Sequence, residues 1–165
     1  MNLRSIITSL LCAIGISAQA ATPQPSLAEE VSAKAALAVS QLQKRAGGKL
    51  DYSVKSLVMI EEILEETSQY KDQLSKKDKD ALVELIGSYI LEVAHRIHGG
   101  KYLWHDKENQ PVLIIGEPKY HVAIITFNKV RGRISGDKAD NIPFFYEGFA
   151  ARIKSATPGT KALYV

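Results

Sequence analysis

The hydrophobic positions between Asp80 and Gly100 repeat at intervals of three and four residues. This is the period of an α-helix, and it gathers the apolar side chains into one broad stripe. Gly99 and Gly100 then supply a left-handed stop. We therefore expect a long helix here that forms the core of the domain. The stripe consists of Leu82, Leu85, Ile86, Tyr89, Ile90, Val93 and Ile97, and the opposite side carries Glu84, Ser88, His95 and His98.

Two weaker helical patterns precede this stretch. The first runs from Leu27 to about Arg45 with a thin, alanine-rich stripe, and Ser26 with Glu29 has the spacing of a capping box. The second, over residues 54–67, has one apolar face and one acidic face. We expect the acidic face to be solvated or, as the alternative, to meet a basic partner. That face consists of Glu61, Glu62, Glu65 and Glu66.

After Gly100 the hydrophobic period changes from that of a helix to two, the period of a β-strand. Three strands over residues 101–105, 111–115 and 120–125, separated by short turns, predict an antiparallel meander. A short helix after Thr126 and a last helix capped by Asn141 follow, and the tail is expected to fray or, as the alternative, to add a short strand. The predicted fold is α+β: N-terminal helices and a central helix packed on a three-stranded antiparallel sheet, followed by C-terminal helices.

The first twenty residues have the pattern of a secretory signal peptide. Arg4 is the positive region, an apolar run extends from Ser5 to Ile16, and small residues stand at Ala18 and Ala20. The run is shorter than the roughly 20 apolar residues that span a bilayer, so we expect cleavage and no stable membrane anchor afterwards. The expected organisation is a signal peptide over 1–20, an extended leader over 21–25, one domain over 26–156 and a tail over 157–165. The expected location is the bacterial periplasm.

Composition and motifs exclude several activities. The one cysteine, Cys12, lies within the predicted signal, so the mature chain is expected to have no disulfide and no thiolate nucleophile. Removing Arg4 lowers the formal net charge from +3 to +2, which is too little to indicate a nucleic-acid partner. The sequence contains no GxSxG elbow, HExxH motif or glycine-rich phosphate loop. We therefore expect no cofactor and favour a binding protein over an enzyme.

Aromatic residues of the predicted strands are one candidate binding site, beside the acidic face described above. Tyr102 and Trp104 point the same way from the first strand, and Tyr120 of the third strand could lie near them. Such a group forms either an exposed patch for a partner protein or part of the core under the helices. Both interpretations remain open from the sequence.

Histidines suggest a weaker alternative site. His95 and His98 lie three residues apart on one helix face, as metal-binding pairs do, and Glu92 and His105 could complete the ligand set. A simpler explanation is that a histidine at a helix C-terminus interacts favourably with the negative end of the helix dipole. We therefore predict no metal site and keep this set as the alternative.

The chain from Gly87 to Ile153 resembles a family of small, uncharacterised bacterial α+β domains. The resemblance implies helices beside a small antiparallel sheet and no known activity, and it includes a loose similarity to immunity-type proteins that bind toxins. It rests on Gly87, Tyr89, Glu92, Val93, Gly99-Gly100, Trp104, the strand Pro111–Ile115 and Phe144–Tyr146, with Leu50–Ser53 in the first half.

The function predicted from these observations is that of a secreted, periplasmic, non-enzymatic module that binds another protein, as an inhibitor or immunity-like protein does. One alternative is a metal-binding protein or metal-dependent hydrolase that uses His95 and His98. Another is a structural accessory subunit of an envelope complex.

Overall fold

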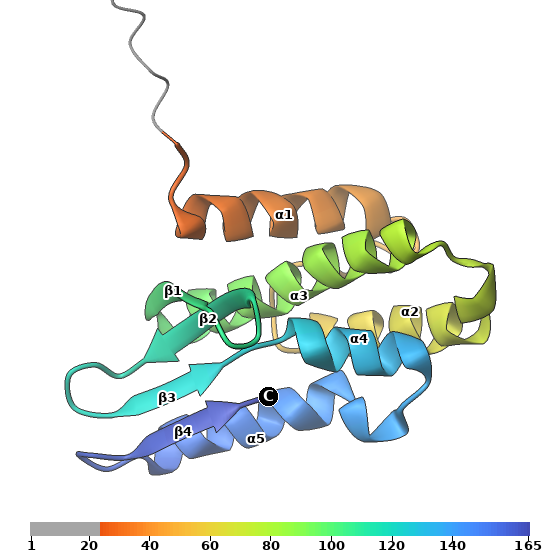
Figure 1. Ribbon diagram of the computed structural model, residues 1–165. Helices are drawn as coiled ribbons and strands as arrows, with labels where there is room; N and C mark the ends of the chain where they lie inside the picture. The colour runs from red at the N-terminus through yellow and green to blue at the C-terminus, as the bar shows by residue number, and fades with distance from the viewer. Residues whose placement is uncertain (1–23) are drawn as a thin grey trace, which may run out of the picture.

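The computed structural model describes residues 24–165, so the predicted signal peptide and most of the leader lie outside the described residues. Over this range the chain forms five α-helices and one four-stranded sheet, which confirms the α+β class (Figure 1). The elements are α1 (Leu27–Leu42), α2 (Ser56–Gln69), α3 (Lys76–His98), β1 (Lys101–His105), β2 (Gln110–Ile115), β3 (His121–Ile124), α4 (Phe127–Ser135), α5 (Ile142–Ser155) and β4 (Lys161–Tyr164), with short 3₁₀ turns at Lys71–Gln73 and Lys138–Asp140.

Helix α3 is the centre of the molecule, as the hydrophobic period predicts. Ser75 caps its first turn by accepting a hydrogen bond from the Asp78 backbone, and Gly99 ends it with a φ of 67°. From Leu85 to Ala94 every residue is buried, including Ser88 on the side expected to face solvent. The reason is that α1 and α4 pack against α3 in addition to the sheet, so a helix with one apolar stripe is enclosed on several sides.

The prediction of a three-stranded antiparallel sheet is correct in part, because the sheet has a fourth strand. β1, β2 and β3 form the predicted antiparallel meander, and the C-terminal tail adds β4 parallel to β3. The backbone amide of His121 donates to Thr160, and that of Ile125 donates to Tyr164. Helix α5 carries the chain back along the sheet before β4, so the last strand runs in the same direction as β3 (Figure 1). The tail is therefore ordered by backbone pairing and does not fray.

The two faces of the sheet differ. One face packs against the helices and buries Leu113, Val122 and Ile124 completely. The opposite face carries Leu103 and Leu163, which are 40% and 46% exposed. The core thus lies on the helix side of the sheet and continues between the helices, and Trp104 stands at its edge, beside α1.

Candidate binding pocket

The acidic face of α2 is largely occupied by contacts within the chain. Arg133 of α4 is 3% exposed; its Nε lies 2.6 Å from Glu61 Oε1, and its guanidinium also pairs with Glu65. The second oxygen of Glu61 accepts a hydrogen bond from the Ile142 backbone at 2.9 Å. Glu66 pairs with Arg45. Three of the four predicted acidic residues therefore fasten neighbouring segments to α2, and Glu62 is exposed.

The three aromatic residues do not form one surface patch. Tyr102 and Trp104 lie on the same side of β1, as the strand period predicts, but Tyr102 is buried and Trp104 is 48% exposed. Burial raises the pKa of the Tyr102 hydroxyl. The rings of Tyr102 and His95 lie side by side, with their centroids 5.1 Å apart. Tyr120 packs instead in the turn before β3, where its ring occupies the space beside Gly116. Trp104 is thus the exposed aromatic member of the predicted set.

The histidines have separate surroundings. His95 Nδ1 lies 4.0 Å from Glu92, whose carboxylate accepts a hydrogen bond from Arg96 at 2.8 Å. His98 packs against Phe149, and His105 Nδ1 accepts a hydrogen bond from the backbone of the following turn. Within residues 24–165 no three His, Cys, Asp or Glu side chains lie together so that they could hold a metal ion.

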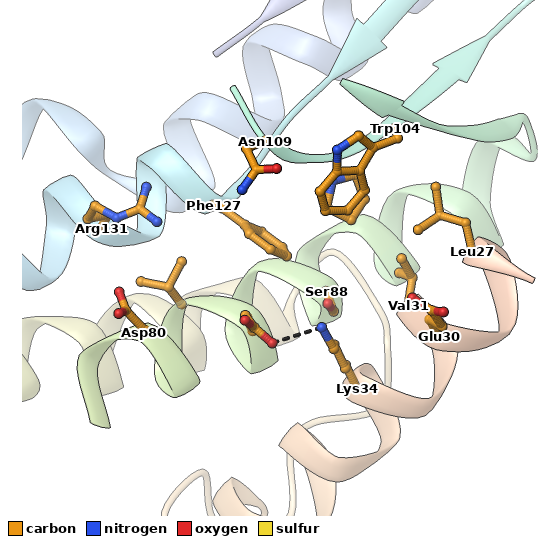
Figure 2. A pocket seen from close by; sticks show the side chains of 13 residues that line it. Leu27, Glu30, Val31, Lys34, Asp80, Ser88, Trp104, Asn109, Phe127 and Arg131 are labelled. Atoms are coloured by element: carbon orange, nitrogen blue, oxygen red, sulfur yellow. Dashed lines mark hydrogen bonds and ion pairs between the residues drawn. The ribbon is translucent and has the colours of Figure 1, made fainter. Parts of the chain in front are cut away.

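A pocket of about 250 Å³ lies beside Trp104, between α1, α3, the β1–β2 hairpin and the start of α4 (Figure 2). Each element contributes residues at its own period: positions three and four apart on the helices, and alternate positions on the strands. The lining residues are Leu27, Glu30, Val31 and Lys34 from α1; Asp80, Val83, Glu84 and Ser88 from α3; Trp104, Asn109 and Pro111 from the hairpin; and Phe127 and Arg131 from α4.

The floor of the pocket is held in place by a close approach of α3 and α4. A Cβ atom on Gly87 would lie 2.4 Å from the ring of Phe127, so only glycine admits that ring here. Thr126 donates a hydrogen bond to the Gly87 carbonyl at 2.8 Å, and the Phe127 backbone donates to the buried Gln110 side chain at 2.8 Å. The position of Phe127 is therefore fixed by α3, β2 and the residue before it.

Ser88 contributes a polar atom to this floor that has no hydrogen-bond partner. The residue is 0% exposed, and its Oγ makes no hydrogen bond within the described part of the chain. Other buried polar atoms share this property, among them the Tyr102 and Tyr146 hydroxyls, but Ser88 alone of these three residues lines the pocket. A buried hydroxyl without a partner costs about 1–3 kcal/mol, so a ligand that satisfied it would recover part of that free energy.

Charges surround the mouth of the pocket and largely offset one another. Lys34 Nζ lies 2.8 Å from Glu84, and this pair joins α1 to α3 (Figure 2). Asp80 accepts a hydrogen bond from Lys76 at 2.9 Å, and this contact lowers the pKa of its carboxyl. Arg131 donates to Asn128. The local field therefore favours no strongly charged ligand.

The turn of the hairpin closes the pocket on the side opposite α1. Asn109 has a φ of 49°, a left-handed conformation that asparagine tolerates better than most residues. This turn directs its side chain over the pocket, near Phe127 (Figure 2). The sequence indicates the turn, but the contribution of Asn109 to a site depends on the path of the hairpin.

Sequence reasoning identified Trp104 and missed most of the other lining residues. Glu84 and Ser88 were expected on the solvent side of the central helix. Their sequence positions differ by four, so both lie on one stripe of the helix. A polar stripe alone cannot indicate a pocket, because most such stripes face solvent. Ser88 becomes significant only when α1 and α4 enclose it.

Comparisons of the chain with protein-family models, curated proteins and solved structures find no match. The resemblance to uncharacterised bacterial domains therefore stays a prediction. Along the part of the chain that the structure covers, none of the helices combines the length and apolar character that crossing a bilayer requires.

Proposed function

We propose that this protein is an exported, non-enzymatic module of the bacterial envelope that binds another protein, in the manner of an inhibitor or immunity-like protein. It holds its partner by taking one side chain of that partner into the pocket beside Trp104. Export rests on the signal-like pattern of residues 1–20 and is part of the proposal.

The observation that carries this proposal is the combination of Trp104 and Ser88. An indole that is 48% exposed stands at the mouth of a pocket whose floor contains a hydroxyl that has no partner in the part of the chain that the structure describes. Exposed tryptophans are frequent energetic anchors of protein interfaces, and such anchors are met by pockets. The pocket, about 250 Å³, is smaller than the roughly 300–1,000 Å³ typical of small-molecule sites, which favours a single side chain as its occupant.

The acidic face of α2 is a weaker candidate for the same role. Glu61 and Glu65 are held by Arg133, so a basic partner would have to displace a buried guanidinium. Removing a buried charge from its partner costs about 3–5 kcal/mol. We therefore place the contact with the partner at Trp104 and not at α2.

A comparative capture experiment tests this proposal. The full-length mature chain, Trp104→Ala and Tyr70→Ala are each immobilised and exposed to envelope extract of the source bacterium at physiological salt. Tyr70 is the matched control, since it is 52% exposed and lies outside the pocket. We expect a protein that is retained by the wild type and by Tyr70→Ala and lost with Trp104→Ala, and that binds again when purified.

Retention that does not differ between Trp104→Ala and Tyr70→Ala would contradict the proposed pocket. Circular dichroism and urea denaturation of both variants show whether the fold is intact. Export is tested separately, by the intact mass of protein recovered from the periplasm of a bacterial host. A mass that begins at Ala21 supports it, and uncleaved protein in the cytoplasm opposes it.

A further inference from the structure

We infer that the group held in the Trp104 pocket is a neutral phenol ring, presented as a tyrosine side chain of the partner. This inference rests on the proposed function and identifies the chemistry of the anchor. It follows from the size of the pocket, the nature of its walls, the charge at its mouth and the Ser88 hydroxyl on its floor.

The size of the pocket fits a substituted single ring. An engineered apolar cavity of about 150 Å³ in another protein binds benzene. The pocket here is about 250 Å³, which leaves room for a ring with one polar substituent and the carbon that attaches it to a backbone. A whole peptide segment would exceed this space.

The walls favour an aromatic occupant. Trp104 and Phe127 present two aromatic surfaces, and Leu27 and Val31 add aliphatic ones from α1 (Figure 2). Aromatic pairs in stacked or edge-to-face geometry gain about 0.5–1.5 kcal/mol beyond the burial of their area, as double-mutant cycles show. An aliphatic ring of the same size would fill the space without that gain.

The polar group of the occupant is determined by Ser88. Its hydroxyl is both a donor and an acceptor, and it has no partner among the described residues. A phenol oxygen can donate to it or accept from it. Solvent does not reach Ser88 in this structure, so the ring must displace side chains at the mouth. Trp104 lies at the surface, 48% exposed, and can turn aside.

The charges at the mouth argue for a neutral group. Lys34 is paired with Glu84, and Asp80 is paired with Lys76. A phosphate, carboxylate or ammonium group would have to break one of these pairs or depend on Glu30 or Arg131, the remaining lining charges, which are opposite in sign and offset each other. A phenol requires neither, because its hydroxyl is un-ionised at neutral pH.

Binding of p-cresol and toluene to the mature protein tests the inference. The two probes have the same ring and methyl group and differ in the phenol oxygen. Trp104 is the single tryptophan in the sequence, so its fluorescence reports occupancy directly. We expect p-cresol to bind about two- to tenfold more tightly than toluene, the range expected for one net hydrogen bond.

Ser88→Ala provides the test of mechanism. It should remove the preference for p-cresol, leaving the two probes within about twofold of one another, while toluene affinity is retained. Ser155→Ala, at an exposed position on α5, is the matched control and should leave the preference unchanged. A third probe, 4-methylcyclohexanol, keeps the oxygen and loses the aromatic ring, and it should bind more weakly than p-cresol.

Equal affinity of p-cresol and toluene for the wild type would overturn the inference, as would a preference that survives Ser88→Ala. Tighter binding of 4-methylcyclohexanol than of p-cresol would overturn its aromatic part. These outcomes leave the proposed function standing if partner capture still depends on Trp104.

The source of the phenol is tested with an acetylated, amidated Gly-Tyr-Gly peptide and its Gly-Phe-Gly counterpart. We expect the tyrosine peptide to bind more tightly than the phenylalanine peptide in the wild type and equally in Ser88→Ala. Binding of p-cresol without binding of either peptide would show that the pocket takes a free phenol. It would then overturn the tyrosine anchor and remove the support it gives to protein binding.

Discussion

Two regions of the molecule treat buried polar groups in opposite ways. Between α2 and α4, Arg133 is enclosed by protein, and its guanidinium forms ion pairs with both Glu61 and Glu65. In the pocket between α1 and α3, Ser88 is equally enclosed, and its hydroxyl has no hydrogen-bond partner among residues 24–165. The first arrangement holds the fold together, because each polar group has its partner within the chain. The second leaves the Ser88 hydroxyl able to form a hydrogen bond with a ligand, which is why we place the binding site there.

A pair of serines makes the same comparison at smaller scale. Ser56 is 1% exposed; it accepts a hydrogen bond from the Tyr89 hydroxyl at 2.7 Å and donates to the Ser53 carbonyl at 2.6 Å. Ser88 is as deeply buried and makes neither kind of bond within the described range. Burial alone therefore does not determine whether a polar residue stabilises the fold, because that also depends on its hydrogen-bond partners.

The largest expected effect comes from breaking the satisfied region. Arg133→Met removes the guanidinium and leaves Glu61, whose side chain is 15% exposed, without its counter-charge. We expect the free energy of unfolding to fall by about 3–5 kcal/mol, measured by urea denaturation. Arg45→Met is the control, because its pair with Glu66 is exposed and should contribute no more than about 1 kcal/mol. Similar losses in both variants would refute the structural role of Arg133.

Two of the helix glycines offer the next comparison. Gly87→Ala forces a methyl group into the ring of Phe127, and we expect a loss of about 1–3 kcal/mol despite the better helix propensity of alanine. The emission of Trp104 should shift as the pocket changes shape. Gly148→Ala in α5 meets only Tyr164 at 3.4 Å, so it should stabilise the protein by up to about 1 kcal/mol. Stabilisation by Gly87→Ala would contradict the close approach of the Phe127 ring to Gly87.

The two serines should respond with opposite signs. Ser56→Ala leaves the Tyr89 hydroxyl without its acceptor, and we expect it to cost about 1–3 kcal/mol. Ser88→Ala removes an unsatisfied hydroxyl and improves helix propensity, so it should be neutral or stabilise by up to about 1 kcal/mol. Thermal and urea unfolding measure both. If Ser88→Ala is as destabilising as Ser56→Ala, then Ser88 is satisfied in solution.

The smallest expected effect is a pH dependence at His98. Its ring packs against Tyr146 and Phe149, its Nε2 makes no hydrogen bond among the described residues, and burial followed by the charge of Lys154 lowers its pKa from 6.5. The folded protein therefore binds fewer protons than the unfolded chain as the pH falls below 6.5. The stability associated with the neutral ring is present above that pH and is lost on acidification through it.

This dependence is measured as the difference in unfolding free energy between about pH 7.5 and pH 5, the range in which histidine titrates. His98→Gln should show a smaller difference than the wild type. His105→Gln serves as a control that also replaces one histidine, because the His105 ring lies at the partly exposed end of β1. A wild-type protein that becomes more stable on acidification, with the gain lost in His98→Gln, would reverse the assigned sign.

The sequence alone determined most of the elements and little of the site. The 3.6-residue period identified α3 as the core, and the predicted caps at Ser26 and Asn141 are present because a cap depends on neighbours within one turn. The alternation after Gly100 identified three strands and their order. These features are local, because each is specified by residues that lie close together in the chain.

Only the tertiary structure decided which of these surfaces are enclosed. The tail became β4 because β3 offers it a backbone edge, and the acidic stripe of α2 became an ion-pair cluster because Arg133 arrives from a distant helix. The same enclosure buried Ser88 beneath Trp104. Periodicity specifies which side chains share a face, but burial depends on what packs against that face, and those contacts are made by residues far apart in the chain.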